Sequence, residues 1–279
     1  MPIHAPAKLN LCLFLGRPRP DGLHEICSLF EPLSLADLIR VGDADRDEVL
    51  CEGVVGENLA SRALEELRGR GWERPPVRIE IEKRIPVAAG LGGGSADAAA
   101  VLRLAAGELS ELEQAAASIG ADVPSQLTPS LALVRGAGER VARLPRPRPH
   151  AVVLLPGGGG LSTAEVYAEA DRLGLGREGA ELEALSKRLL TAAGAGGSPL
   201  EYADLLENDL ERAARSLRPE VGEALEDLRA AGAPASLMTG SGPTVFGLFE
   251  GITAAREAAA RLGRDDAIVC AAGTAGEAG

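Results

Sequence analysis

Strand-like and helix-like hydrophobic patterns follow one another along the whole chain, and no internal repeat is visible. The clearest strand is 77–85, VRIEIEKRI, in which apolar and charged residues alternate. The clearest helix begins at Ser95 as SADAAAVLRLAAG and ends at Gly107. Further strands are predicted at 3–15, 27–33, 37–42, 48–52, 131–134, 140–144, 151–156 and 267–271, with a strand, glycine turn and strand over 235–250. Further helices are predicted at 58–70, 110–119, from 162 onward, and at 178–192, 199–214, 218–231 and 252–262.

Short motifs predict how some of these elements begin. RPRPDG, at 17–22, is typical of a turn that joins two strands in an opening hairpin. Ser110 with Glu113, and Ser162 with Glu165, have the spacing of a capping box, in which each side chain bonds a backbone N–H at the helix start. We therefore expect helices to begin at both serines.

A proline-rich segment, PRPRP at 145–149, separates two parts of the chain and is the best candidate for a linker. With 279 residues, 46% of them hydrophobic, the chain can bury one large core or two smaller ones. We predict two domains, 1–147 and 151–272. The Gly- and Ala-rich residues after 272 are expected to fray.

Composition narrows the range of partners. The formal net charge of −12, with no Lys/Arg-rich run, gives a surface that repels nucleic acid and anionic lipid at long range, so neither is expected as a partner. No signal-peptide pattern opens the chain, and no run has the roughly 18 apolar residues of a spanning helix. The four cysteines form no C-x-x-C pair and share no metal-ligand spacing with the three histidines. These features predict reduced thiols, no metal site built by the protein, and a cytoplasmic location.

Only three lysines, Lys8, Lys83 and Lys187, occur among the 29 basic residues. Arginine is the usual cation of this chain, so a retained lysine can mark a position that needs a compact point charge. We expect two of the three to be ordinary surface residues.

A glycine-rich segment lies between the strand at 77–85 and the helix from Ser95. Its glycines allow the backbone to approach a polyphosphate, and the unpaired N–H groups and positive dipole end of the helix attract an anion. We expect it to hold nucleotide phosphates. The segment comprises Pro86, Val87, Ala88, Ala89, Gly90, Leu91, Gly92, Gly93, Gly94, Ser95 and Ala96.

Other interpretations of this segment fit less well. A Walker A loop needs a lysine before Ser95, where Gly94 stands, and a dinucleotide fingerprint would open the first strand–helix unit and end in glycine. A purely structural turn needs only one or two glycines. A second glycine run, 157–160, follows the apolar strand at 151–156 and is a further candidate for a nucleotide loop.

Three segments together resemble motifs of the GHMP kinases. PVAAGLGGGSADAAA at 86–100 is similar to their phosphate loop, and APAKLNLCL at 5–13 is similar to their N-terminal motif. LMTGSGPTVF at 237–246 resembles their C-terminal glycine motif, so the matches occur in order across nearly the whole chain. The resemblance implies an α+β fold of two domains with the active site in the interdomain cleft.

Three shorter segments resemble those members of the family that act on a cytidine-diphosphate-linked polyol: DGLHE at 21–25, GADVP at 120–124 and ENDLE at 207–211. The resemblance then implies an ATP-dependent kinase, with Mg²⁺ arriving with ATP, that phosphorylates the 2-hydroxyl of this polyol in non-mevalonate isoprenoid synthesis. A kinase for another small alcohol, or a nucleotide-binding protein without turnover, remains an alternative.

The family's catalytic residues match Lys8 and Asp122, which would face the acceptor hydroxyl. Such a carboxylate can take the hydroxyl proton, and the ammonium can keep the carboxylate ionised and offset phosphate charge. Asp122 could also be a helix N-cap.

Ser95 would face a phosphate oxygen or the Mg²⁺, although a plain N-cap would have the same sequence. Asn10 is expected on the same strand face as Lys8, because side chains alternate with period two, and so becomes a candidate for binding the acceptor. The alternative is an asparagine bonded only to backbone.

The base of the acceptor has two implied contacts. His24 matches the family position that hydrogen-bonds cytosine, and Tyr167 falls where the family carries an aromatic that stacks on the base. Thr239, Gly240, Ser241 and Gly242 would line the site from the second domain, unless the glycines only permit a tight hairpin.

Two positions depart from the family pattern. Leu23 stands where the family usually has tyrosine, and Ser125 and Gln126 stand where it has aromatic residues. Base–aromatic stacking contributes about 1–3 kcal/mol per base, so Leu23 is expected to weaken cytidine binding unless its own apolar contact compensates.

Overall fold

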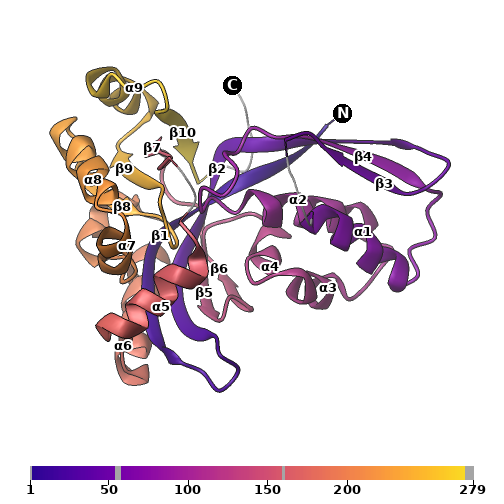
Figure 1. Ribbon diagram of the computed structural model, residues 1–279, viewed down its shortest axis with the longest axis horizontal. Helices are drawn as coiled ribbons and strands as arrows, with labels where there is room; N and C mark the ends of the chain where they lie inside the picture. The colour runs from indigo at the N-terminus through magenta and orange to yellow at the C-terminus, as the bar shows by residue number, and fades with distance from the viewer. Residues whose placement is uncertain (1, 54–57, 159–160, 274–279) are drawn as a thin grey trace.

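A long antiparallel hairpin, β1 (Ile3–Pro18) and β2 (His24–Asp43), runs through the middle of the molecule in the computed structural model, which describes residues 2–53, 58–158 and 161–273 (Figure 1). β2 is one continuous strand, so the prediction of two strands at 27–33 and 37–42 was wrong. Pairing with β1 simply continues past the intervening residues across a register shift. The turn predicted at 17–22 does join the two strands.

The strands of the described part of the chain form one sheet, whose main path has the order β3-β4-β2-β10-β7-β9-β8. One edge of β2 pairs with β1, and the other pairs in turn with β5 (Ala132–Gly136), β10 (Ile268–Ala272) and β4 (Val77–Glu82). The remaining strands are β3 (Glu48–Cys51), β6 (Arg140–Arg143), β7 (His150–Leu155), β8 (Ala235–Met238) and β9 (Val245–Phe249). The linker predicted at 145–149 lies between β6 and β7, and the two domains predicted at 1–147 and 151–272 stay a prediction.

The helices form two groups on either side of the long hairpin (Figure 1). The first group contains α1 (Leu59–Gly69), α2 (Gly93–Leu102), α3 (Leu112–Ile119) and α4 (Val123–Gln126), with a 3₁₀ turn at Arg103–Ala105. The second contains α5 (Thr163–Leu173), α6 (Gly179–Ala193), α7 (Glu211–Leu217), α8 (Glu220–Ala230) and α9 (Ile252–Leu262), with a 3₁₀ helix at Pro199–Leu205. Each group covers its own apolar cluster, and a third cluster lies along the hairpin between them.

Alternation and small side chains explain the clearest elements. β4 buries every second residue, as its sequence predicted, although it ends at Glu82 and not at 85. α2 is buried from Ala96 to Leu102, because a helix of alanines can pack closely on all sides. It begins at Gly93, two residues before the predicted start.

Both predicted capping boxes were wrong. α3 begins after Glu111 and α5 after Ser162, and neither helix has a side-chain cap. The helix predicted over 199–214 is also interrupted, because residues 207–209 leave the helical path and bond to β1. A frayed tail was predicted after 272; Gly273 is still placed, and 274–279 lie outside the described residues.

A buried ion pair joins the two halves of the sheet. His150, in β7, places Nε2 3.0 Å from Oε2 of Glu31 in β2, and its Nδ1 lies 2.9 Å from the Arg148 carbonyl oxygen. Both ring nitrogens therefore face acceptors, a setting that favours the imidazolium form. Burial lowers the pKa of His150, but the hydrogen bond and charge of Glu31 raise it by more, so this pKa lies above its ordinary value.

We predict that His150 makes stability depend on pH in the neutral to alkaline range. A raised histidine pKa stabilises the fold fully below the unfolded-state pKa of about 6.5, and this contribution is lost as pH rises through the folded-state pKa. The free energy of unfolding, measured with urea, should therefore be higher for wild type than for His150→Gln, and the difference should be larger at pH 6 than at pH 9. A difference between the two proteins that does not change with pH would contradict this assignment. His4→Gln serves as the control, because no ion pair of His4 is found in the described residues.

Candidate active site

A cavity of about 900 Å³ lies between the long hairpin, the glycine loop and α5. Both halves of the chain contribute to its wall. The lining residues are Lys8, Asn10, Leu13, Gly22, Leu23, His24, Ile26, Phe30, Gly90, Gly92, Ser95, Ala121, Asp122, Ala137, Thr163, Ala164, Tyr167, Ala168, Asp171, Gly240 and Ser241.

The two residues predicted to share the acceptor hydroxyl lie side by side, although 114 positions separate them in sequence. Lys8 Nζ is 3.3 Å from Asp122 Oδ2, with the lysine side chain 7% exposed and the carboxylate 30% exposed. Lys8 projects from β1, and Asp122 directly precedes the short helix α4 without capping it by its side chain. The carboxylate is thus both paired with a cation and open to the cavity.

Lys8 is held from several sides. Its ammonium donates to Asn10 Oδ1 at 2.5 Å and lies 4.7 Å from the centre of the Phe30 ring, a cation–π distance. Asn10 in turn donates from Nδ2 to Ser28 Oγ at 2.9 Å. Asn10 is therefore bonded to side chains, not only to backbone, and its amide oxygen orients the lysine.

Two glycine loops approach β1 closely at this point. Lys8 donates its backbone N–H to Leu91 O at 2.9 Å, and a Cβ on Gly92 would lie only 2.8 Å from Lys8 Cγ. Two residues further along the same edge of the strand, the Asn10 N–H donates to Thr239 Oγ1 at 2.8 Å. Thr244 Oγ1 also donates to Ala89 O at 2.6 Å, so the two loops are tied to each other as well as to the strand.

The glycine loop leads directly into α2, as predicted. The first helical bond runs from Ala96 N to Gly92 O, which leaves the N–H groups of Gly93, Gly94 and Ser95 without partners inside the helix. Gly90, Gly92 and Ser95 line the cavity. Free N–H groups at a helix N-terminus are donors of the kind that can bind a phosphate, and the prediction that this loop does so stays a prediction.

The expectation that two of the three lysines are ordinary surface residues was wrong, because Lys83 as well as Lys8 is largely buried. The Lys83 ammonium donates to Asp37 and, at 2.8 Å, to Asp97 Oδ2, and the lysine side chain is 13% exposed. Burial, despite the opposing charge of Lys83, raises the pKa of Asp97 to about 7. Asp37 also accepts the N–H groups of Arg84 and Ile85, so this cluster fixes the start of the glycine loop beneath α2.

The two predicted base contacts form an aromatic pair on the opposite wall. The rings of His24 and Tyr167 are 5.1 Å apart and tilted by 54°. His24 Nε2 lies 2.8 Å from Asp171 Oδ1, a partner that the sequence did not reveal. Burial, with the charge of Asp122, raises the pKa of Tyr167 to about 12, so its hydroxyl stays protonated at neutral pH.

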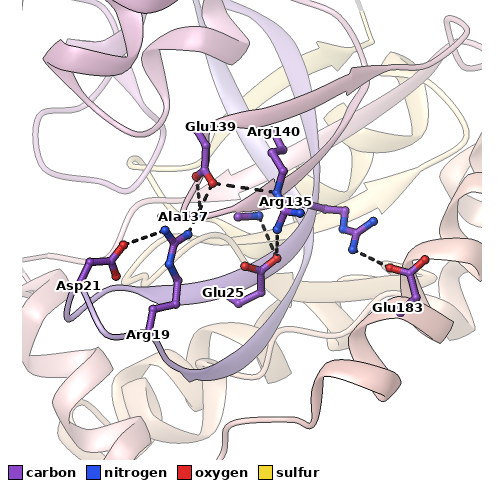
Figure 2. A network of polar contacts seen from close by, with 9 residues as sticks. Arg19, Asp21, Glu25, Arg135, Ala137, Glu139, Arg140 and Glu183 are labelled. Atoms are coloured by element: carbon purple, nitrogen blue, oxygen red, sulfur yellow. Dashed lines mark hydrogen bonds and ion pairs between the residues drawn. The ribbon is translucent and has the colours of Figure 1, made fainter.

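The rim beside His24 is braced by the ion pairs that Figure 2 shows. Arg19 joins Asp21 of the hairpin turn, at 2.7 Å, to Glu139 of the β5–β6 turn, at 3.5 Å. Leu23 lies on this rim and is 54% exposed. The position where the family has tyrosine thus does border the cavity.

The other departures lie elsewhere. Ser125 and Gln126 are buried in α4 and donate to the backbone oxygens of Asp122 and Pro6, so they do not line the cavity. Of the second glycine run, Gly157 packs against Pro243 and neither it nor Gly158 is on the cavity wall. Residues 159–160 of that run lie outside the described residues.

Comparison with known proteins agrees with this geometry. The family model of the GHMP kinases N-terminal domain matches residues 58–128, and that of the GHMP kinases C-terminal domain matches 182–267. The chain belongs to the GHMP kinase family. Its curated relatives include the 4-diphosphocytidyl-2-C-methyl-D-erythritol kinase of Pelotomaculum thermopropionicum, 41% identical over 94% of this chain and 93% of the relative. The 4-diphosphocytidyl-2-C-methyl-D-erythritol kinase of Mycolicibacterium gilvum is 42% identical over 87% of this chain and 80% of the relative.

Solved structures give the same result. A crystal structure of a 4-(cytidine 5'-diphospho)-2C-methyl-D-erythritol kinase has a TM-score of 0.81 and 38% identity, and the match covers 98% of this chain and all of that one. A homoserine kinase from Cytophaga hutchinsonii shares only the fold, with a TM-score of 0.70 and 18% identity over 98% and 93% of the two chains. The two-domain α+β GHMP kinase fold predicted from the motifs is confirmed. In the described residues, no helix is both long and apolar enough to cross a membrane.

The close approach at Gly92 generates a prediction. Gly92 has φ +69°, and an added Cβ would collide with the Lys8 stem. Gly92→Ala should therefore displace the Lys8 ammonium and lower turnover about 100-fold, the usual effect of a misplacement near 1 Å. The measurement is steady-state phosphoryl transfer, with circular dichroism to verify folding.

Gly69→Ala is the matched control, because Gly69 ends α1 and a Cβ there would meet nothing within 4 Å. It should leave turnover within about twofold of wild type, as expected of an exposed substitution. Equal activity of folded Gly92→Ala and Gly69→Ala would show that the contact between the loop and Lys8 has no role in turnover.

Proposed function

We propose that this chain transfers the terminal phosphoryl group of ATP to the 2-hydroxyl of 4-diphosphocytidyl-2-C-methyl-D-erythritol, a step of isoprenoid biosynthesis. The observation that carries the proposal is the Lys8–Asp122 pair, placed between a phosphate-binding glycine loop and the His24–Tyr167 pair. The curated relatives that cover most of the chain have this activity in their names.

Each group has a role that follows from its surroundings. Asp122 can accept the proton of the acceptor hydroxyl, because its carboxylate lies 3.3 Å from the Lys8 ammonium and is open to the cavity. Lys8 also offsets charge on the transferring group. The loop from Pro86 to Ala96 would hold the ATP phosphates through its N–H groups, as the start of α2 allows.

The divalent ion would come with ATP. The described residues contain no group of three or more His, Cys, Asp or Glu side chains that could hold a metal. A Mg²⁺ ion that keeps phosphate oxygens and waters as most of its ligands fits this arrangement, with the Ser95 hydroxyl as the protein's contribution. When bound, such an ion neutralises phosphate charge.

The acceptor would lie along the other wall. Asn10, Gly240 and Ser241 would contact its polar groups, and His24 and Tyr167 its base. Thr239, predicted to line the site, is fully buried and is not on the cavity wall, and its hydroxyl accepts the Asn10 N–H. Leu23, at the rim, would provide an apolar contact in place of a stacking ring. The proposal includes a reducing, cytoplasmic compartment, in keeping with four cysteines that form no disulfide.

A coupled ADP-release assay against several acceptors tests the proposal. The cytidine-bearing polyol should be phosphorylated with a far higher kcat/KM than the same polyol phosphate without cytidine or than homoserine. Equal rates with acceptors that lack cytidine would favour a kinase for another small alcohol. ATP binding without any phosphorylated product would favour a nucleotide-binding protein.

The contact between Lys8 and Asp122 predicts non-additive losses. Asp122→Asn keeps the size of the side chain but cannot take the proton, so turnover should fall about 10²- to 10⁴-fold with ATP affinity nearly unchanged. Lys8→Met should lose a comparable factor. Because the two groups act as a unit, the double variant should be scarcely slower than the slower single variant.

Single-turnover kinetics and calorimetry of ATP binding should be measured for wild type, both single variants and the double variant. Near-normal turnover of folded Asp122→Asn would remove the proposed base. Losses that multiply in the double variant would show that the two residues act independently.

Base recognition predicts an effect on one substrate only. Tyr167→Ala should raise the KM of the cytidine-bearing acceptor roughly 10- to 100-fold, because a stacking contact contributes about 1–3 kcal/mol, and should leave the KM of ATP nearly unchanged. Leu23→Tyr should lower the acceptor KM. An equal rise for both substrates, measured in the same assay, would place the base elsewhere.

A further inference from the structure

The ENDLE segment, 207–211, is bonded along the edge of β1 that does not pair with β2. Leu13 donates to Glu207 O at 2.8 Å, and Asp209 N donates to Leu13 O at 2.9 Å, so the segment pairs with the strand as a short parallel bridge. The Asp209 carboxylate accepts a hydrogen bond from the Leu15 N–H at 2.8 Å. It also accepts hydrogen bonds from Nε and Nη2 of Arg177, each at 2.7 Å. The segment is thereby fixed to the same strand that carries Lys8 and Asn10.

Asn208 uses this fixed position to reach the second glycine loop. Its Nδ2 donates to Met238 O at 2.7 Å and to Gly240 O at 2.9 Å, and its Oδ1 accepts the Leu210 N–H at 3.0 Å. The residue is 8% exposed, and its amide protons and its oxygen all have partners. A buried amide with all of these bonds holds its partners firmly, because breaking one leaves an unpaired polar group.

These bonds decide which way the loop presents its backbone. Asn208 lines a different cavity, of about 500 Å³, and is absent from the wall of the active-site cavity, so both carbonyls are turned away from the active site. Gly240 and Ser241 do line the active-site cavity, and in the described part of the chain their N–H groups have no hydrogen-bond partner. Two residues with unpaired N–H donors therefore lie on the cavity wall, while the carbonyls of Met238 and Gly240 are bonded to Asn208 behind it.

The donors lie beside the catalytic pair. Gly240 has φ +57°, and a Cβ there would lie 3.2 Å from Asn10 Oδ1 and 3.9 Å from Lys8 Nζ. Successive N–H groups in such a turn form a concavity that binds anions. A rotation of the Gly240 peptide would instead turn a carbonyl oxygen towards the substrate phosphates.

We propose that Asn208 is a positioning residue that keeps the Gly240 and Ser241 N–H groups directed at a phosphate group of a bound substrate. The inference rests on the proposed function, in which both substrates carry such groups. The phosphate belongs either to ATP or to the cytidine diphosphate of the acceptor, and the experiment below separates the two sources.

Amide NMR of the wild-type protein provides the first test. A non-hydrolysable ATP analogue and cytidine 5'-diphosphate are titrated separately, and the Gly240 and Ser241 amide resonances are followed. The ligand whose phosphate is bound should shift both resonances downfield at saturation. If neither ligand moves them, the inference is wrong.

Asn208→Asp then tests the positioning role. The substitution keeps the size and the bond to Leu210 N, but its oxygens cannot donate to Met238 O and Gly240 O. We expect kcat to fall about 100-fold, the ligand-induced amide shifts to shrink, and the melting temperature to change little. Glu207→Gln is the matched control, since the Glu207 side chain is 63% exposed and Arg177 is its one ion-pair partner among the described residues; it should behave as wild type.

Two further outcomes are informative. Folded Asn208→Asp with normal turnover and full amide shifts would overturn the proposal, and if this variant does not fold, Asn208→Gln takes its place with the same criteria. If wild type binds the ATP analogue with shifted Gly240 and Ser241 amides yet phosphorylates no cytidine-bearing acceptor, the proposed function fails and the positioning role stands.

Discussion

The close packing of two glycine loops against β1 is the constraint on which the rest of the site depends. Lys8 and Asn10 lie on this strand, with Gly92 against the lysine stem and Gly240 against the asparagine amide. Side chains at either glycine would push the loops away from the strand. Because the loops belong to different halves of the chain, the same packing that forms the site also joins those halves.

Charge is distributed so that an acidic protein can bind anionic substrates. The chain has a formal net charge of −12, and Lys8 is the one Lys or Arg on the described wall of the cavity. Lys83 lies near the glycine loop, but Asp37 and Asp97 neutralise it, so it holds the loop in place and is not free for substrate. Phosphate charge must therefore be met by Lys8, by backbone N–H groups and by the ion that ATP carries.

Sequence reasoning succeeded where short motifs determine local backbone. The glycine loop, the helix that follows it and the strand with Lys8 were predicted from residue types alone, the helix start to within two residues, and the pairing of Lys8 with Asp122 followed from the family resemblance. It failed where a tertiary contact decides the outcome. Ser162 does stand at the N-cap of α5, but neither its side chain nor that of Ser110 caps a helix. Asn208 leaves the predicted helix because its amide finds two carbonyls of a distant loop.

Partners far apart in sequence were missed for the same reason. Asp171 beside His24, Phe30 beneath Lys8 and the two aspartates around Lys83 carry no local signal, since only the folded sheet brings them together. The charged residues in otherwise apolar segments, such as Asp97 in the alanine-rich helix, were the one available sign that a buried cation lay nearby.

The central claim is that ATP and the acceptor hydroxyl meet at Lys8 and Asp122. A crystal structure with a non-hydrolysable ATP analogue and the cytidine-bearing polyol tests it most directly. The account predicts the acceptor 2-hydroxyl within hydrogen-bond distance of the Asp122 carboxylate, with the terminal phosphate between Lys8 and the N-terminus of α2. Phosphates bound instead at the 157–158 glycines, or an acceptor hydroxyl remote from Asp122, would contradict it.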